Sequence, residues 1–285
     1  MTRASMTVKP LTRALGAEIS GIDLTETPDQ ATLDAIYDAL IEHLVIFFRD
    51  QPMEPEAHLT FARSFGEPEP PHPVYPHAPG FENVMVLAND ADNPPDTNDW
   101  HTDVTFRQNP PFASILCAKE VPETGGDTLW ASMYAAYDAL PDEMKTYLED
   151  KTAIHDFGDF RNDFIKQEGG IQALNTALAR VGSALHPVVQ RHPVTGRPFL
   201  FVNRPFTVQV VDLNSRESDR LLEYLFDHID RPEFQVRFRW EPDSVAMWDN
   251  RVTQHYAVAD YMPDRRRMHR VTVVDDRRIA RSNAA

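Results

Sequence analysis

A histidine and an aspartate separated by one residue, His101-Thr102-Asp103, form the first group in this chain that could bind a metal ion. The preceding residues 93–100 are rich in proline and turn formers, so we expect extended backbone here rather than helix. Side chains at positions i and i+2 of an extended segment point to the same side. His255 is the candidate for a third ligand. Two imidazoles and one carboxylate occupy one face of an octahedral ion and leave positions open, the arrangement suited to iron(II) oxygen chemistry.

A second pair of the same pattern, His228-Ile-Asp230, provides an internal comparison. It falls at the end of a helix predicted over residues 215–228, where positions i and i+2 point about 200° apart. We therefore expect this pair to be inert. The pattern alone is a weak signal, and the interpretation of His101 as a ligand depends on the arginines located after His255.

Two arginines after His255 indicate an anion-binding site. Arg266 and Arg270 are four positions apart, so on a strand they share a face, whereas His269 points to the other face. A buried guanidinium needs an anion, and its planar fork binds a carboxylate through two hydrogen bonds. A co-substrate of iron(II) oxygen chemistry, 2-oxoglutarate, carries such a carboxylate at the end opposite its metal-chelating group. Iron(II) chemistry with this co-substrate requires a metal triad and an arginine on the same wall of a barrel.

The elements that must position these residues are mostly short strands. Strand-like runs cover residues 45–48, 83–87, 113–118, 185–189, 199–202, 235–239, 245–248 and 268–274. Helical patterns cover residues 29–44, 55–65, 132–150 with an interruption near Pro141, and 215–228. Residues 192–197 have the composition of a hairpin turn. We predict a mainly β fold with flanking helices, a jelly roll, forming a single domain over residues 1–285 with its core at about 8–276.

The composition excludes several classes of partner. The formal charge is −16 and the isoelectric point is about 5.0, so the surface repels phosphate backbones and we expect no nucleic-acid partner. No apolar run approaches the ~20 residues that span a bilayer, so we expect no membrane partner. The N-terminal residues lack a secretory pattern. A cytoplasmic location is the resulting expectation, and the single cysteine, Cys117, lies in an apolar run typical of a core strand.

Five segments resemble the taurine dioxygenase family, iron(II)- and 2-oxoglutarate-dependent dioxygenases that include taurine and aryloxyalkanoate dioxygenases. They are Trp100–Phe106, Gly125–Trp130, Trp248–Tyr256, Arg265–Arg270 and His72–His77. The likeness extends from about Val8 to Asp276, with the motifs in the family's order. It implies a double-stranded β-helix that uses iron(II), 2-oxoglutarate and oxygen.

The resemblance assigns the inner part of the site residue by residue. His101, Asp103 and His255 match the iron ligands. Thr128 and Arg266 match the pair that binds the distal carboxylate of 2-oxoglutarate. These assignments agree with the interpretation of the triad and the buried arginine given above.

The resemblance also assigns positions that contact the substrate. Those matching the sulfonate-binding group are His72, the backbone N–H of Val104, and Arg270. Tyr75, Phe160 and Phe206 match aromatic residues of the substrate pocket. The chain departs from the family pattern at Thr97, where taurine dioxygenase has an asparagine that contacts the substrate amine. A threonine hydroxyl can accept a hydrogen bond from an ammonium group, but its reach is shorter.

The predicted reaction is hydroxylation of the carbon next to a sulfonate, most simply that of taurine, releasing sulfite and an aldehyde with succinate and CO2. The partner would be a small sulfonate anion, and a homo-oligomer would fit the family. Thr97 keeps open another alkylsulfonate or an alkyl sulfate ester. A hypothesis from a different class is a jelly roll that binds a metal or small anion without oxygen chemistry. The arginine pair argues against it, because plain metal binding does not require those residues.

Overall fold

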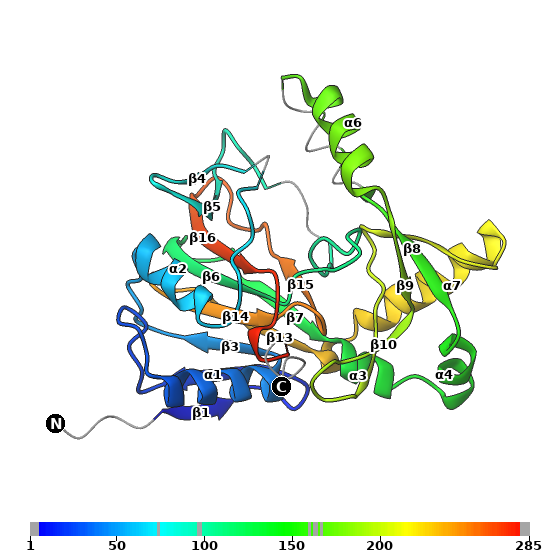
Figure 1. Cartoon of the computed structure of the whole chain (residues 1–285), viewed down its shortest axis with the longest axis horizontal. Coiled ribbons are helices and arrows are strands. Elements are labelled where there is room, and N and C mark those ends of the chain that lie inside the picture. The colour runs from blue at the N-terminus through cyan, green and yellow to red at the C-terminus, as the bar shows by residue number, and fades with distance from the viewer. Residues whose placement is uncertain are drawn as a thin grey trace.

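An eight-stranded sheet forms one layer of the protein (Figure 1). The computed structural model describes residues 6–72, 75–95, 99–158, 161, 165 and 168–279. Across the sheet the strands are β1 (Thr7–Pro10), β2 (Ala17–Ser20), β3 (Val45–Phe48), β14 (Val245–Asp249), β6 (Ala113–Glu120), β16 (Arg266–Val273), β5 (Phe81–Asn89) and β4 (His77–Ala78). All neighbouring strands run antiparallel except β2 and β3. Most neighbours are far apart in the chain, so the sheet depends on long-range pairing.

A three-stranded antiparallel sheet forms the second wall of the barrel. Its order is β13 (Gln235–Phe238), β7 (Thr128–Ser132) and β15 (Thr253–Ala257). The two sheets, antiparallel apart from the β2–β3 pair, enclose a common core. They make the double-stranded β-helix that was expected, so the predicted fold class is confirmed.

Alternation along the strands divides the apolar residues between two cores. Trp130, Trp248 and Met268 belong to a cluster between the two sheets. Val271 and Val273, on the opposite face of β16, belong to a second cluster on the outer side of the large sheet. The even-numbered positions of β16 therefore face the barrel interior, as predicted for Arg266 and Arg270.

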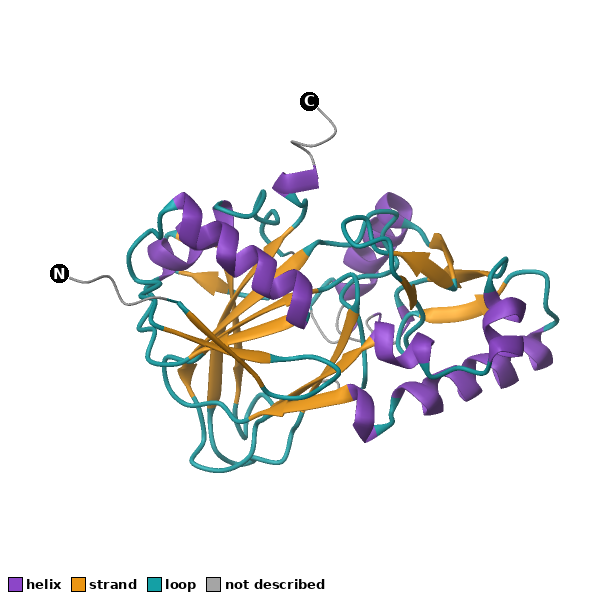
Figure 2. Cartoon of the chain, turned by 90° about the horizontal axis from the view of Figure 1, so that it is seen from below, coloured by secondary structure: helices purple, strands orange, loops and turns teal. Residues whose placement is uncertain are grey.

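Helices α1 (Gln30–His43) and α2 (Pro55–Arg63) cover that outer side (Figure 2). The Asp29 side chain caps α1 by accepting the N–H of Thr32 at 2.9 Å. Leu33, Ile36 and Leu40 recur at helical spacing on its buried face. Both helices were predicted, because the cap of α1, the proline that begins α2 and helical periodicity are local signals.

The remaining elements flank the small sheet. Strands β8 (Thr152–His155), β9 (Ala184–Pro187) and β12 (Thr207–Val210) form a third sheet, and β10 (Val189–Arg191) pairs with β11 (Pro198–Leu200). The helices here are α3 (Met133–Asp138), α4 (Asp142–Leu148), α6 (Gly170–Val181), α7 (Ser215–Ile229) and the 3₁₀ turn η2 (Pro232–Phe234). The β10–β11 hairpin, the break at Pro141 and α7 were predicted. The elements that were not predicted are α6, η2, β1, β2, β4, β7, β8, β12 and β15.

Within the described ranges, no helix has the length and apolar character needed to cross a bilayer. The cytoplasmic location and the single-domain organisation stay predictions.

Acid should destabilise the fold through His58, which is buried on α2. Its Nε2–H donates to the carbonyl of Ile115 at 3.2 Å, while its buried Nδ1 has no hydrogen-bond partner among the described residues. Burial lowers the pKa of His58 from 6.5 to about 3. Because the folded-state pKa lies below the unfolded one, the neutral ring stabilises the fold above pH 6.5, and this contribution is lost as the pH falls toward 3. At pH 5 we expect a loss of about 2 kcal/mol in the free energy of unfolding from this residue.

The measurement is the free energy of unfolding in denaturant at pH 7 and pH 5. The difference between the two values should be smaller in His58→Leu than in wild type. An equal difference in both proteins would contradict this role.

Candidate active site

An antiparallel bridge brings His101 and His255 together. The N–H of His101 donates to the carbonyl of His255 at 3.1 Å, and the N–H of His255 donates to the carbonyl of His101 at 2.8 Å. Residues directly opposite in an antiparallel pair project to the same side. Their ring centroids are 4.1 Å apart. Backbone pairing thus joins residues from distant parts of the chain.

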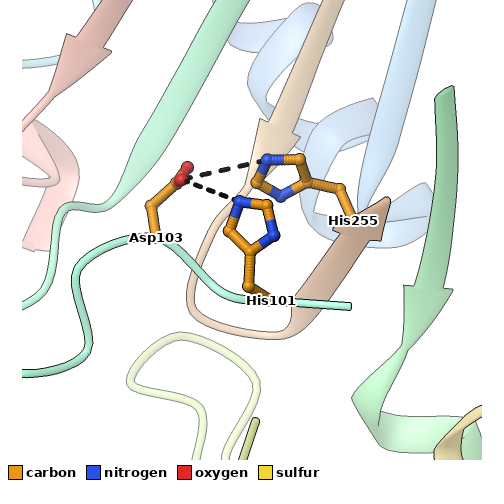
Figure 3. Close-up of side chains that lie close together, drawn as sticks. All are labelled: His101, Asp103 and His255. Atoms are coloured by element: carbon orange, nitrogen blue, oxygen red, sulfur yellow. Dashed lines mark ion pairs between the residues drawn. The ribbon is translucent and has the colours of Figure 1, made fainter. Parts of the chain in front are cut away.

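Asp103 completes the group from two residues beyond His101 (Figure 3). Its Oδ1 lies 3.6 Å from His101 Nε2 and 3.8 Å from His255 Nε2, and one potential ligand atom from each residue lies within 4.8 Å of the others. The ring Nδ1 of His101 donates to the carbonyl of Asp99 at 2.8 Å, which leaves the lone pair on Nε2 facing the other two residues. In the part of the chain that the structure describes, no other set of three such residues converges in this way.

Asn250 holds the backbone of Asp103 from both sides, a role that sequence reasoning missed. Its Oδ1 accepts the N–H of Asp103 at 3.0 Å, and its Nδ2 donates to the carbonyls of Asp103 and Pro111 at 3.3 and 3.2 Å. The Thr102 hydroxyl also donates to the carbonyl of Thr253 at 2.8 Å. Asn250 stands in the Trp248–Tyr256 motif, but a single sequence does not say which backbone groups a buried amide meets.

The electrostatics keep Asp103 and His255 in metal-binding protonation states. Burial by itself raises the pKa of Asp103, but the Arg270 guanidinium and the two imidazoles outweigh it and hold that pKa well below its usual range. Burial, followed by the nearby His101, lowers the pKa of His255 to about 3, so the ring is neutral at physiological pH. A carboxylate and two imidazole nitrogens are the donor set that suits iron(II). The residues present therefore fit that ion.

Arg266 is a buried cation without a carboxylate partner. It is 6% exposed, its Nε–H donates to the carbonyl of Gly126 at 3.1 Å, and its Nη2 donates to the hydroxyl of Thr128 at 3.4 Å. Among the described residues, no acidic side chain lies within ion-pair distance of it, and burial lowers its pKa. His255 pairs opposite Trp130, two residues from Thr128, so Thr128 and His255 share a face of the small sheet. This pair can hold an anion beside the triad.

A second arginine reaches the triad itself. The Arg270 guanidinium contacts the Asp103 carboxylate, donates to the Ser114 hydroxyl at 2.8 Å and lies over the ring of Trp248. His72 lies close enough that, after burial and the charge of Arg107, the charge of Arg270 helps to lower its pKa to about 4. Positive charge from Arg107 and Arg270 therefore lies close to Asp103 and His72.

The other described residues that were predicted to contact the substrate lie next to His72, Asp103 or His101. The N–H of Tyr75 donates to His72 Nδ1 at 3.3 Å, and their rings are 4.8 Å apart. Val104 adopts a positive φ of 48° immediately after Asp103. The ring of Phe206 stands edge-on to His101 at 6.5 Å. Thr97 and Phe160 lie outside the described residues.

The second His-x-Asp pair does not converge. His228 lies on α7 and bonds the carbonyl of Ala136 at 2.8 Å, and Asp230 ends the helix. This is the helix-end position predicted from the sequence.

A double-stranded β-helix with two histidines and one carboxylate at its open end defines a class of metal-dependent dioxygenases. The sequence profile of the "Taurine catabolism dioxygenase TauD, TfdA family" matches residues 7–272. The chain belongs to this family of iron(II)- and 2-oxoglutarate-dependent dioxygenases, whose co-substrate is O2.

Individual relatives are similar over nearly the whole chain. An alkylsulfatase of Acinetobacter baylyi is 38% identical, with 94% of this chain and 85% of the relative covered. An alpha-ketoglutarate-dependent sulfate ester dioxygenase of Pseudomonas putida is 37% identical, with coverages of 94% and 89%. The crystal structure of a taurine dioxygenase from Burkholderia xenovorans superposes with a TM-score of 0.82 at 38% identity, covering 95% of this chain and 90% of that one.

A solved structure of AAD-2 holds Mn(II) and N-oxalylglycine. It superposes with a TM-score of 0.80 at 27% identity, covering 94% of this chain and 96% of that one. Mn(II) is a stand-in for iron(II), and N-oxalylglycine is a 2-oxoglutarate analogue. The family thus accounts for both the metal and the co-substrate.

Proposed function

We propose that the chain cleaves alkyl sulfate esters by oxidising the carbon that carries the sulfate. His101, Asp103 and His255 would hold the iron, and Thr128 with Arg266 the distal carboxylate of 2-oxoglutarate. When bound, iron(II) with 2-oxoglutarate and oxygen supplies the oxidising power for C–H hydroxylation, and 2-oxoglutarate leaves as succinate and CO2. The hydroxylated ester then releases sulfate and an aldehyde. An alkanesulfonate would react in the same way and release sulfite.

The observation that carries the proposal is the position of Arg270 against Asp103. A guanidinium beside the metal-binding carboxylate can hold a sulfo group so that the attached carbon lies next to the metal. His72, with Nδ1 engaged by Tyr75, carries its proton on Nε2 and can donate to the same anion. The backbone N–H of Val104 is the third proposed donor.

An apolar cluster beside the triad favours an alkyl chain over the amine of taurine. Phe106, Phe157, Leu174 and Phe206 pack together, and α6 adds Ala177, Leu178 and Val181. Phe206 connects the cluster to His101. An ammonium group would lose its hydration at such a surface, whereas methylene groups gain from contact with it. The names of the two relatives, alkylsulfatase and sulfate ester dioxygenase, support the same order of preference.

Taurine, the substrate predicted first from the sequence, stays a candidate because a taurine dioxygenase is among the similar solved structures. Possible assembly into a homo-oligomer also stays a prediction.

The test is an aerobic assay with iron(II) and 2-oxoglutarate on hexyl sulfate, hexanesulfonate and taurine, with sulfate and sulfite measured separately. At ~0.8 kcal/mol for each buried methylene, we expect kcat/KM for hexyl sulfate to exceed that for taurine by more than about tenfold. Preferential release of sulfite from taurine would restore the first prediction. If none of the three compounds changes the rate of 2-oxoglutarate turnover, the proposed substrate class is refuted.

Arg270→Ala should separate the two anions of the reaction. We expect KM for hexyl sulfate to rise roughly 10- to 100-fold, because a charge-assisted contact of about 1.5–3 kcal/mol is lost. The KM for 2-oxoglutarate and the turnover of 2-oxoglutarate without substrate should change little. Arg267→Ala is the matched control, since this partly exposed neighbour is on the opposite face of β16 and lies near Glu120. Equal loss of both activities in Arg270→Ala would contradict this division of roles.

A further inference from the structure

The Thr128 hydroxyl receives two hydrogen bonds from groups that can only donate. The indole Nε1–H of Trp240 donates to Thr128 Oγ1 at 2.9 Å, and Arg266 Nη2 donates to the same oxygen at 3.4 Å. A hydroxyl has two lone pairs and one proton. Both lone pairs are therefore occupied, and neither neighbour can accept the proton.

The hydroxyl proton of Thr128 has no acceptor among the described residues, although the side chain is 2% exposed. A buried donor without an acceptor is energetically unfavourable. The rest of the Arg266 guanidinium also has no acceptor in the described part of the chain. The Thr128 O–H and the remaining N–H groups of Arg266 can together donate to one carboxylate.

We propose that Trp240 is a positioning residue for 2-oxoglutarate, acting through Thr128. By occupying one lone pair, the indole turns the hydroxyl proton toward the distal carboxylate of the co-substrate. This inference rests on the proposed role of Thr128 and Arg266. It adds a residue outside the recognised motifs, two positions beyond the end of β13.

Packing makes Trp240 a fixed donor. The side chain is 4% exposed, and its ring stands edge-on to Phe238 at 5.1 Å and tilted against Trp130 at 6.4 Å. The Arg266 guanidinium carbon lies 5.9 Å from its ring centroid. A donor confined in this way orients the hydroxyl before the co-substrate arrives, so less entropy is lost on binding.

The decisive variant is Trp240→Phe, which keeps an aromatic ring and removes the N–H. Iron(II)-loaded enzyme is titrated calorimetrically with 2-oxoglutarate in the absence of oxygen, so that binding is measured without turnover. We expect Kd to rise about 3- to 10-fold, as for one neutral hydrogen bond. Tyr134→Phe is the matched control, because it removes one hydrogen bond, to Thr195 at 2.8 Å, from another buried aromatic residue, whose ring packs against His192 and Phe199. It should lower the melting temperature comparably and leave Kd unchanged.

Two further comparisons identify Thr128 as the intermediary. A 2-oxo acid without a distal carboxylate, 2-oxobutanoate, should bind wild type and Trp240→Phe equally well. In a Thr128→Val background, Trp240→Phe should add no further loss of 2-oxoglutarate affinity, because the group it orients is gone. A loss that persists with 2-oxobutanoate, or that adds to Thr128→Val, would show a general disturbance of the pocket and overturn the inference.

The outcome also separates this inference from the proposed function. If Arg266→Ala weakens 2-oxoglutarate binding but Trp240→Phe does not, the co-substrate site stands and the role of Trp240 is wrong. If neither variant changes Kd, the assignment of Thr128 and Arg266 fails as well.

Discussion

Asp103→Ala is expected to abolish iron(II) binding and to reduce substrate-dependent turnover by at least about a thousandfold, equivalent to about 4 kcal/mol in activation free energy. The carboxylate is the one anionic member of the triad. Its Oδ1 lies 3.6 Å from His101 Nε2 and 3.8 Å from His255 Nε2. Its removal leaves only the two imidazoles, which by themselves hold iron(II) poorly against water. Iron content after dialysis and sulfate release from hexyl sulfate measure the two effects.

The second His-x-Asp pair supplies the control for this variant. Asp230→Ala removes the same side chain from the same dipeptide pattern, but on α7, away from the triad. It should retain iron and activity. A dialysed Asp103→Ala protein that keeps stoichiometric iron and wild-type turnover would exclude Asp103 as a ligand. Melting temperatures distinguish loss of the metal from loss of the fold.

Arg266→Ala should raise the KM for 2-oxoglutarate roughly 10- to 100-fold, because a charge-assisted contact worth about 1.5–3 kcal/mol is removed. Arg266 is buried, and no carboxylate among the described residues neutralises it. The Arg266→Ala variant therefore loses mainly a binding partner for the co-substrate and not an internal ion pair. The KM for hexyl sulfate should change little, since Arg270 and not Arg266 contacts Asp103.

Arg265→Ala is the neighbouring control for that experiment. Arg265 is about half exposed and lies 3.7 Å from Glu120, so its loss should leave both KM values unchanged. Initial rates at varied 2-oxoglutarate, with substrate saturating, provide the measurement. Wild-type affinity for 2-oxoglutarate in Arg266→Ala would mean that the co-substrate carboxylate is bound elsewhere.

Local signals in the chain were sufficient for several elements of the fold. The Asp29 cap and the spacing of Leu33, Ile36 and Leu40 predicted α1, since capping and helical periodicity involve residues within a few positions of one another. Strand alternation predicted that Arg266 and Arg270 share a face and that His269 does not. Residue types and motif order predicted the triad and its family.

Other elements depended on partners far along the chain. Strand β15, which carries His255, and strand β7, which carries Thr128, are five residues each and pair with each other across more than a hundred positions. Helix α6 was missed too, and its N-terminus follows a glycine without a side-chain cap. Short segments of this kind have too little local preference to be recognised without their neighbours.

The contacts that prepare the site arise only on folding. Asn250 clamps Asp103, and Trp240 donates to Thr128, across long stretches of sequence. A hydrogen bond between two buried side chains depends on where the sheets place them to within a fraction of an ångström, and residue type carries no such information. Chemistry could therefore be inferred from the order of residues, whereas the orientation of each reactive group follows from how the two sheets pack.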